Sequence, residues 1–237
     1  MTNQFNARRG CVPDDKRNFS CAGIENMRLA SRHIGYLINE GYDLKQATTF
    51  VGNHFLLSER QRLVVMRSLA TNEQINDRES KRIETANLYG CDVWVDGFNT
   101  VITLEVMLCD SILLECMDGT IRDLAALRGT YRIIPETHDA VRLLFDILNE
   151  TKLRSATILL DAPVSNSGRL KTLMAEIGRD YSFGLDIQIK KDVDRELYDK
   201  ENVITSDSII LDRCTSWVNL TAACMKHLAK TGYRVWE

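Results

Sequence analysis

The chain has 237 residues, of which 44% are hydrophobic and 27% charged, and its net charge is -3. This composition is typical of a globular protein with a substantial core, and it excludes a long disordered chain. No apolar stretch approaches the roughly 20 residues of a membrane span. The seven cysteines include no CxxC pair, which favours reduced thiols in the cytoplasm over a disulfide framework or a zinc knuckle.

The first 70 residues are expected to form a compact helical bundle. Apolar residues recur at helical spacing between Ser20 and Asn39, and two further helices are expected to begin at Asp43 and Ser58. Each of these two residues is followed three positions later by a glutamine, which is typical of a helix start. Three arginines lie on or near the third helix, which is compatible with a DNA-reading helix-turn-helix or with a simple bundle surface: Arg60, Arg62 and Arg67.

A polar stretch over residues 71–86 predicts a solvated helix or a linker, and we place a domain boundary there. Residues 1–85 carry 13 Lys and Arg against 10 Asp and Glu, whereas residues 86–237 carry 17 against 23. We therefore expect a mildly basic helical bundle, with a possible role in binding nucleic acid or a partner, followed by an acidic second domain.

The second domain is predicted to be α/β with a parallel sheet, because short apolar runs alternate with amphipathic segments. Two β-rich runs, at residues 101–108 and 111–116, predict a hairpin. Strands are expected at residues 91–95, 157–160, 185–189 and 203–205, and helices at residues 137–149, 169–177 and 220–229.

Three of the predicted strands are followed by an aspartate: Asp96, Asp161 and Asp207. Because ligands bind outside the carboxyl ends of parallel strands, these side chains are expected to converge at one edge of the sheet. A cluster of carboxylates repels itself unless a hard cation such as Mg²⁺ or Mn²⁺ binds it. Any single aspartate in such a place is more simply a turn former or a helix cap, so the hypothesis depends on the three together.

The motifs VDGFN at residues 95–99 and VITSDSIILD at residues 203–212 resemble the first and a later strand of PIN/NYN-type ribonuclease domains, with TILLDAP at residues 157–163 as the strand between them. The resemblance implies that Asp96 and Asp207 are metal ligands with Asp212 nearby, and that Asn99 orients a ligand or water. It also implies an acidic residue before the last strand, for which Asp194 and Glu196 are alternatives. One departure is the β-rich run VITLEVML, which follows the first strand where these domains have a helix.

The whole chain, with the segment VGNHFLLSERQR before its α/β part, also resembles an uncharacterised prokaryotic family that is described only as a domain of unknown function. That second resemblance implies no activity.

Two further features have open interpretations. The loop with Ser165, Ser167 and Arg169 is either a phosphate cradle that binds substrate at a helix start or a plain loop that ends in a cap. Glu105 lies in an apolar run, where a carboxylate needs a partner. It could face the acidic site, an arginine such as Arg122, or solvent.

The sequence therefore predicts a metal-dependent nuclease acting on RNA, with Asp96, Asp207 and either Asp161 or Asp212 holding Mg²⁺ or Mn²⁺. The alternatives are a non-catalytic module that binds nucleic acid or protein, and a phosphoryl-transfer enzyme acting on a small metabolite. RNA is the expected partner, contact with a membrane is not expected, and self-association is left open.

Overall fold

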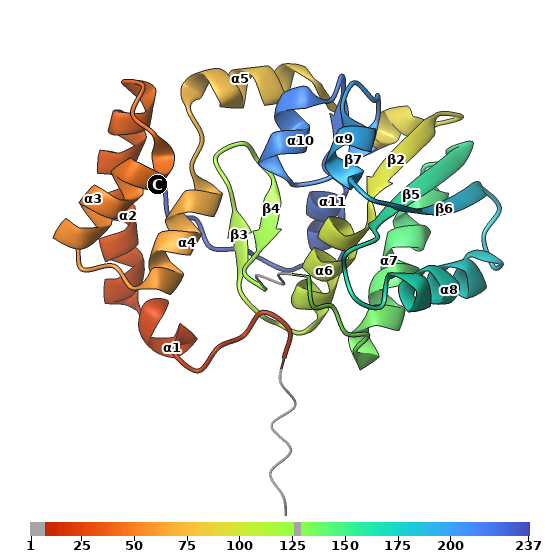
Figure 1. Ribbon diagram of the computed structural model, residues 1–237, viewed down its shortest axis with the longest axis horizontal. Coiled ribbons are helices and arrows are strands. Elements are labelled where there is room, and N and C mark those ends of the chain that lie inside the picture. The colour runs from red at the N-terminus through yellow and green to blue at the C-terminus, as the bar shows by residue number, and fades with distance from the viewer. Residues whose placement is uncertain (1–7, 126–128) are drawn as a thin grey trace, which may run out of the picture.

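The computed structural model describes residues 8–125 and 129–237. A helical region and an α/β region lie side by side, and a small hairpin stands between them (Figure 1). In the described part of the chain, no helix is both long enough and apolar enough to cross a membrane.

The helical region begins its helices where the sequence predicts. Ser20 and Asp43 accept hydrogen bonds from the backbone N–H three residues on, and Ser58 forms a full capping box with Gln61. These caps satisfy backbone donors that a helix start leaves free. The helices are α1 (Asp15–Asn18), α2 (Cys21–Asn39), α3 (Leu44–His54) and α4 (Glu59–Ser68).

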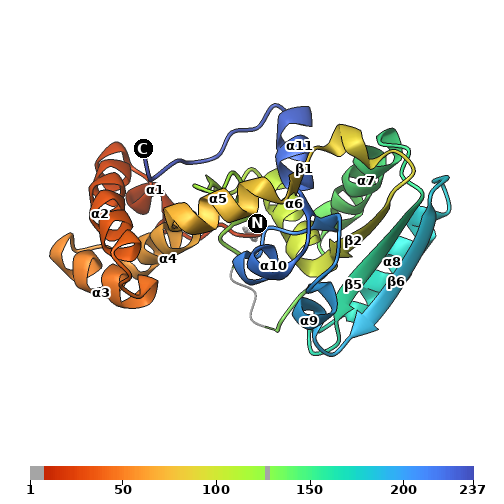
Figure 2. The same ribbon diagram turned by 90° about the horizontal axis from the view of Figure 1, so that it is seen from above.

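The polar stretch that follows connects the two regions. It forms α5 (Asn72–Ser80), which a capping box of Thr71 and Gln74 begins, and then β1 (Arg82–Ile83). Of the two predicted alternatives, helix and linker, the helix is present. Because β1 pairs with β8, this stretch ends as the edge strand of the main sheet. Figure 2 shows α5 extending from the helical region towards the sheet.

A six-stranded sheet forms the centre of the α/β region, and every neighbouring pair of its strands is parallel, as the sequence predicts. The spatial order is β1–β8–β7–β2–β5–β6. The five strands besides β1 are β2 (Asp92–Asp96), β5 (Ser155–Asp161), β6 (Gly184–Lys190), β7 (Val203–Ile204) and β8 (Trp217–Val218). Strands β7, β2 and β5 are neighbours, so the three predicted strands that precede an aspartate lie next to one another.

Helices cover both faces of the sheet. The larger core lies on one face, where alternate strand residues such as Val95 and Ile158 contact apolar helix side chains. Residues of the opposite parity, such as Leu159 and Val203, pack with Trp217 and the two short helices of the other face. The helices on the first face are α6 (Gly97–Leu108), α7 (Pro135–Glu150), α8 (Ser167–Gly178) and α11 (Leu220–His227). Those on the second face are α9 (Val193–Leu197) and α10 (Ser208–Arg213). A 3₁₀ turn, η1, spans Thr85–Leu88 before β2.

The prediction of β structure over residues 101–108 is wrong, because this run is the body of helix α6. Valine, isoleucine and threonine lower helix propensity only slightly, and burial of most of this helix outweighs that preference. Gly97 allows the tight entry into the helix, since a Cβ there would lie 2.7 Å from the carbonyl oxygen of Leu159. A helix therefore does follow the first strand, and the departure noted from the PIN/NYN pattern disappears.

The hairpin is real but lies later in the chain than predicted. It joins β3 (Leu113–Glu115) to antiparallel β4 (Ile121–Asp123). Residues of this hairpin and of the C-terminal tail complete the core of the helical region: Leu114, Cys116, Leu124 and Val235. The chain after α11 returns to the helical region, where the C-terminus lies beside α2 (Figures 1 and 2).

Candidate functional site

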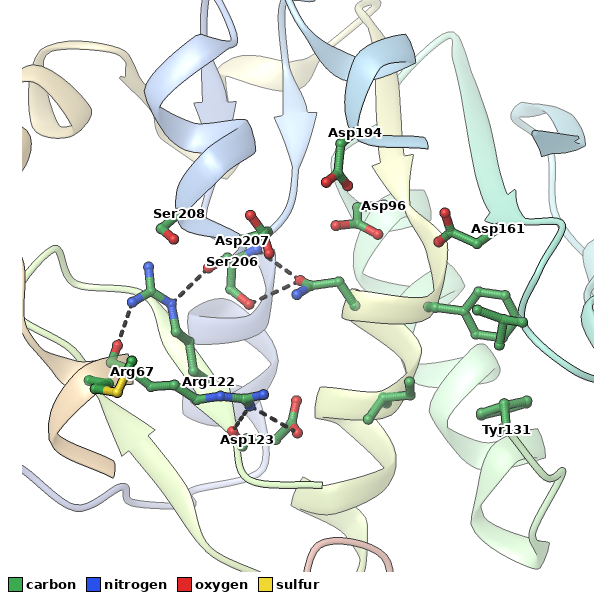
Figure 3. Close-up of a pocket in the computed structure, with 15 residues that line it drawn as sticks. Arg67, Asp96, Arg122, Asp123, Tyr131, Asp161, Asp194, Ser206, Asp207 and Ser208 are labelled. Carbon is green, nitrogen blue, oxygen red and sulfur yellow. Dashed lines mark hydrogen bonds and ion pairs between the residues drawn. The ribbon is translucent and has the colours of Figure 1, made fainter. Parts of the chain in front are cut away.

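A cavity of about 410 Å³ opens at the carboxyl ends of the central strands. Four aspartates line it on the side of the sheet: Asp96, Asp161, Asp194 and Asp207. Two arginines line it on the side of α4 and the hairpin, and Figure 3 shows both groups around the same space. The site therefore combines a carboxylate cluster with a basic wall.

Asp96 is the most deeply placed of the carboxylates. It ends β2, is 6% exposed, and accepts a 2.9 Å hydrogen bond at Oδ2 from the hydroxyl of Thr205. Within the described residues, its Oδ1 accepts no hydrogen bond. Burial raises the pKa of Asp96 to about 8, and the charges of the other three aspartates add to this shift. A side chain of this kind is costly to ionise without a cation.

Asp161 and Asp194 reach the cavity from different elements. Asp161 ends β5, and Asp194 lies in the first turn of α9. Burial raises the pKa of both carboxyls, and nearby aspartates raise them further, with Asp207 contributing at Asp194. Of the two sequence alternatives for a fourth acid, the structure brings Asp194 to the cavity. Glu196 instead lies 3.4 Å from Lys190.

Asp207 follows β7 and caps α10, where its Oδ1 accepts a 2.8 Å hydrogen bond from the backbone N–H of Ile209. The loop before it is fixed by Asn99, whose Oδ1 accepts 2.9 Å hydrogen bonds from both the N–H and the hydroxyl of Ser206. Figure 3 shows these bonds beside Asp207. Asn99 thus lines the cavity and also holds the loop that carries Asp207.

The basic wall consists of Arg67 from α4 and Arg122 from β4. Arg122 donates to the carbonyl of Ser206 at 2.8 Å, to Asp118 at 2.7 Å and to the carbonyl of Arg67. Arg67 donates through Nη1 to the carbonyl of Asp123 and lies 3.7 Å from its carboxylate. Sequence reasoning did not assign this wall to the site, although charged residues inside an otherwise apolar hairpin were a signal for it.

Several predicted residues lie outside the cavity. Ser165 bonds the backbone N–H and carbonyl of Tyr131, so it fixes a loop, and neither Ser167 nor Arg169 lines the cavity. Asp212 lies 2.7 Å from Arg78 on the far side of α10. The structure does not bring these four residues to the carboxylates.

Of the three partners considered for Glu105 from the sequence, the structure supplies an arginine, but it is Arg9 and not Arg122. Glu105 is fully buried in α6 and lies 2.6 Å from the guanidinium of Arg9. The hydroxyls of Tyr131 and Thr137 donate to its Oε1. Glu105 therefore holds the N-terminal segment against α6 and does not line the cavity.

The other two arginines near the third helix also contact the protein itself. Arg60 donates to Asp15, and Arg62 donates to the carbonyl of Leu57.

The donor atoms at the strand ends are all oxygens, which is the chemistry that Mg²⁺ and Mn²⁺ prefer. Across residues 8–125 and 129–237, no group of three or more His, Cys, Asp or Glu side chains is placed so that it could hold a metal ion. Mg²⁺ keeps several waters and binds proteins through one or two carboxylates, so a pair such as Asp96 and Asp207 is sufficient. The residues fit such an ion by donor type and by Oδ1 of Asp96, which accepts no hydrogen bond from the described residues.

Comparison with known proteins identifies relatives over most of the chain. The model of a family described as "Domain of unknown function (DUF5616)" matches residues 85–223, and that of "Protein of unknown function (DUF434)" matches residues 26–81. A Methanocaldococcus jannaschii protein, "Uncharacterized protein MJ0935", is 34% identical over 207 residues, which cover 86% of this chain and 99% of that protein. No solved structure matches the chain. The expected likeness to an uncharacterised prokaryotic family is confirmed.

Proposed function

The chain belongs to the family described as "Domain of unknown function (DUF5616)", and from the site that it carries we propose that it is a metal-dependent nuclease that hydrolyses phosphodiester bonds in RNA. The observation that carries the proposal is Asp96, a buried carboxylate whose Oδ1 accepts no hydrogen bond from the described residues, at a cavity that Asp161, Asp194 and Asp207 also line. The strand order and the helix after β2 support the likeness to PIN/NYN-type domains on which the proposal also draws.

In this proposal Asp96 and Asp207 hold Mg²⁺ or Mn²⁺, with Asp161 and Asp194 beside them. A bound cation would polarise the phosphate and lower the pKa of an attacking water. Asp96 would lose its proton on binding the ion, because carboxylate ligands bind in the ionised form. Asn99 would keep Asp207 in place through the Ser206 loop. The products would be a phosphate monoester and a hydroxyl end.

A second candidate is phosphoryl transfer on a small nucleotide, and the volume of the cavity favours it. A space of about 410 Å³ lies within the range of small-molecule sites. The predicted phosphate cradle at Ser165, Ser167 and Arg169 gives this candidate no support, because it lies outside the cavity. We place either activity in the cytoplasm, which the seven free cysteines support.

The test is cleavage of a labelled single-stranded RNA, with a mononucleotide as the alternative substrate. We expect the wild type to cleave the RNA with Mg²⁺ or Mn²⁺ and not with a chelator. Asp207→Asn should reduce the rate by at least about 100-fold, whereas Asp212→Asn, the same change outside the cavity, should retain most of it. RNA binding without cleavage under any metal would leave only a binding module, and turnover of the mononucleotide alone would favour the second candidate.

A further inference from the structure

The two arginines of the basic wall differ in how many of their donors the protein already uses. All three nitrogens of Arg122 donate to protein acceptors, which lie in three different segments. Arg122 is also buried, with 8% of its surface exposed. It therefore positions the Ser206 loop, and three of its five N–H groups already donate to protein acceptors.

Arg67 has donors to spare. Its side chain is 34% exposed, and Nη1 both donates to the carbonyl of Asp123 and lies 3.7 Å from the carboxylate of that residue. Among the described residues, Nε and Nη2 of Arg67 have no acceptor. The contacts with Asp123 and the position on α4 hold the guanidinium at the cavity wall, so its free edge can bind an anion without first being ordered.

Resting on the proposed nuclease function, we propose that Arg67 binds a phosphate of a single RNA strand, so that the helical region forms one wall of the substrate cleft. A phosphate entering a site lined by five carboxylates is repelled, and the guanidinium opposite the strand-end aspartates offsets that repulsion. Arginine presents two parallel N–H groups to a phosphate, which fixes its orientation as well as its position.

The apolar part of the lining indicates a single strand. Met66, Phe98 and Ile102 line the same cavity as Arg67 and the aspartates. In single strands the faces of the bases are free to contact such groups, whereas in a duplex they are stacked. The strand ends lie on one side of the cavity and α4 with the hairpin on the other (Figure 3), so a single strand between them can contact both walls.

The experiment measures binding of a fluorescent single-stranded RNA in chelator at several salt concentrations, and cleavage kinetics of the same RNA in Mn²⁺. The variants are Arg67→Ala, Arg67→Lys and, as a matched control, Arg32→Ala, which removes an exposed arginine from α2. Arg67→Ala should raise the dissociation constant and KM by about 10-fold to 100-fold. It should also lower the slope of log Kd against log salt by about 0.7, the loss of one phosphate contact.

Arg67→Lys should keep the salt slope and bind RNA with an affinity between those of Arg67→Ala and the wild type. Lysine retains the positive charge but lacks the two parallel N–H groups of arginine. Arg32→Ala should bind and cleave as the wild type does. Duplex RNA should bind more weakly than the single strand, and a mononucleotide should compete poorly. Thermal melting of each variant identifies any loss of fold. If Arg67→Ala does not fold, the comparison of Arg67→Lys with the wild type tests the proposal.

The outcomes separate this inference from the nuclease proposal. If the wild type cleaves RNA while Arg67→Ala keeps its KM and salt slope, the role of Arg67 is wrong and the nuclease stands. If the wild type binds RNA through Arg67 and cleaves none, the phosphate site stands and the nuclease fails. Weaker binding with an unchanged slope would make Arg67 a structural residue only. A mononucleotide that binds as tightly as the RNA would overturn the single-strand part.

Discussion

At the scale of single residues, the carboxylates that line the cavity on the side of the sheet come from the ends of strands and from the first turn of α9. Asp96 and Asp161 end strands, and parallel neighbours bring such ends together. Asp212 was a weaker prediction because it lies five residues after Asp207 on a helix, which turns it by about 140° away from the cap position. The choice between Asp194 and Glu196 needed the orientation of α9, which no local pattern fixes.

We predict that Asp207→Asn leaves the metal-free protein as stable as the wild type, within about 0.5 kcal/mol, or slightly more stable. Asparagine is as good a cap as aspartate, so the bond to the N–H of Ile209 is kept, and one repelling charge is removed. The rise in melting temperature on adding Mn²⁺ should shrink, because a neutral oxygen binds a hard cation less well.

Thermal melting with and without Mn²⁺ checks this, and Asp139→Asn, at an exposed side chain of α7, serves as the control for charge. A full metal-induced shift in Asp207→Asn would show that Asp207 is not a ligand.

At the scale of elements, periodicity and caps predicted most helices and strands, and composition misled where burial dominates. Helix α6 is rich in β-branched residues and is almost entirely buried, so its apolar run has no helical face to recognise. The basic wall was missed for a related reason: β4 is three residues long, and its partners come from distant segments.

A buried charge network joins several of these elements. Arg78 of α5 is 2% exposed and contacts Asp118 at 2.6 Å and Asp212 at 2.7 Å. Asp118, at the tip of the hairpin, also contacts Arg122 at 2.7 Å. Burial raises the pKa of the Asp118 carboxyl, but the two arginines and the hydroxyl of Thr120 outweigh it and leave the pKa lowered. The network links the connecting helix to the basic wall.

We predict that Asp118→Asn destabilises the protein by about 3 kcal/mol at pH 7, because it removes the anion that pairs with buried Arg122 and leaves buried Arg78 with Asp212 alone. The lowered pKa means that ionised Asp118 stabilises the folded state above the pKa of the unfolded chain, 3.8. This contribution is lost as the pH falls through the lower pKa of the folded state. Urea unfolding over a pH series should show that the difference in free energy of unfolding between variant and wild type becomes smaller below about pH 4. A difference that is constant with pH would mean that the charge of Asp118 is not what stabilises the fold.

At the scale of the whole molecule, the helical and α/β regions are less separate than the sequence suggested. The predicted boundary at residue 85 lies close to the junction of the two matched family models, at residues 81 and 85. The core of the helical region nevertheless includes hairpin and C-terminal side chains such as Leu114 and Val235. Contacts between segments so far apart in the chain cannot be read from local periodicity.

We therefore predict that the full chain unfolds in a single thermal transition. Val235→Ala in the helical core and Val203→Ala in the sheet should each cost about 2 kcal/mol and lower the same transition by about 4–8 °C. Calorimetry checks this, with equal calorimetric and van't Hoff enthalpies as the criterion. Two transitions, of which each variant moves only one, would contradict a shared core.

Binding of a divalent cation by the strand-end aspartates is the step on which the proposed activity depends. The most direct measurement is anomalous diffraction from crystals soaked in Mn²⁺. We expect one ion bound between the carboxylates of Asp96 and Asp207, at the cavity that Asp161, Asp194 and Arg67 also line. Crystals that bind Mn²⁺ only elsewhere, or leave these carboxylates without an ion at saturating Mn²⁺, would contradict this expectation.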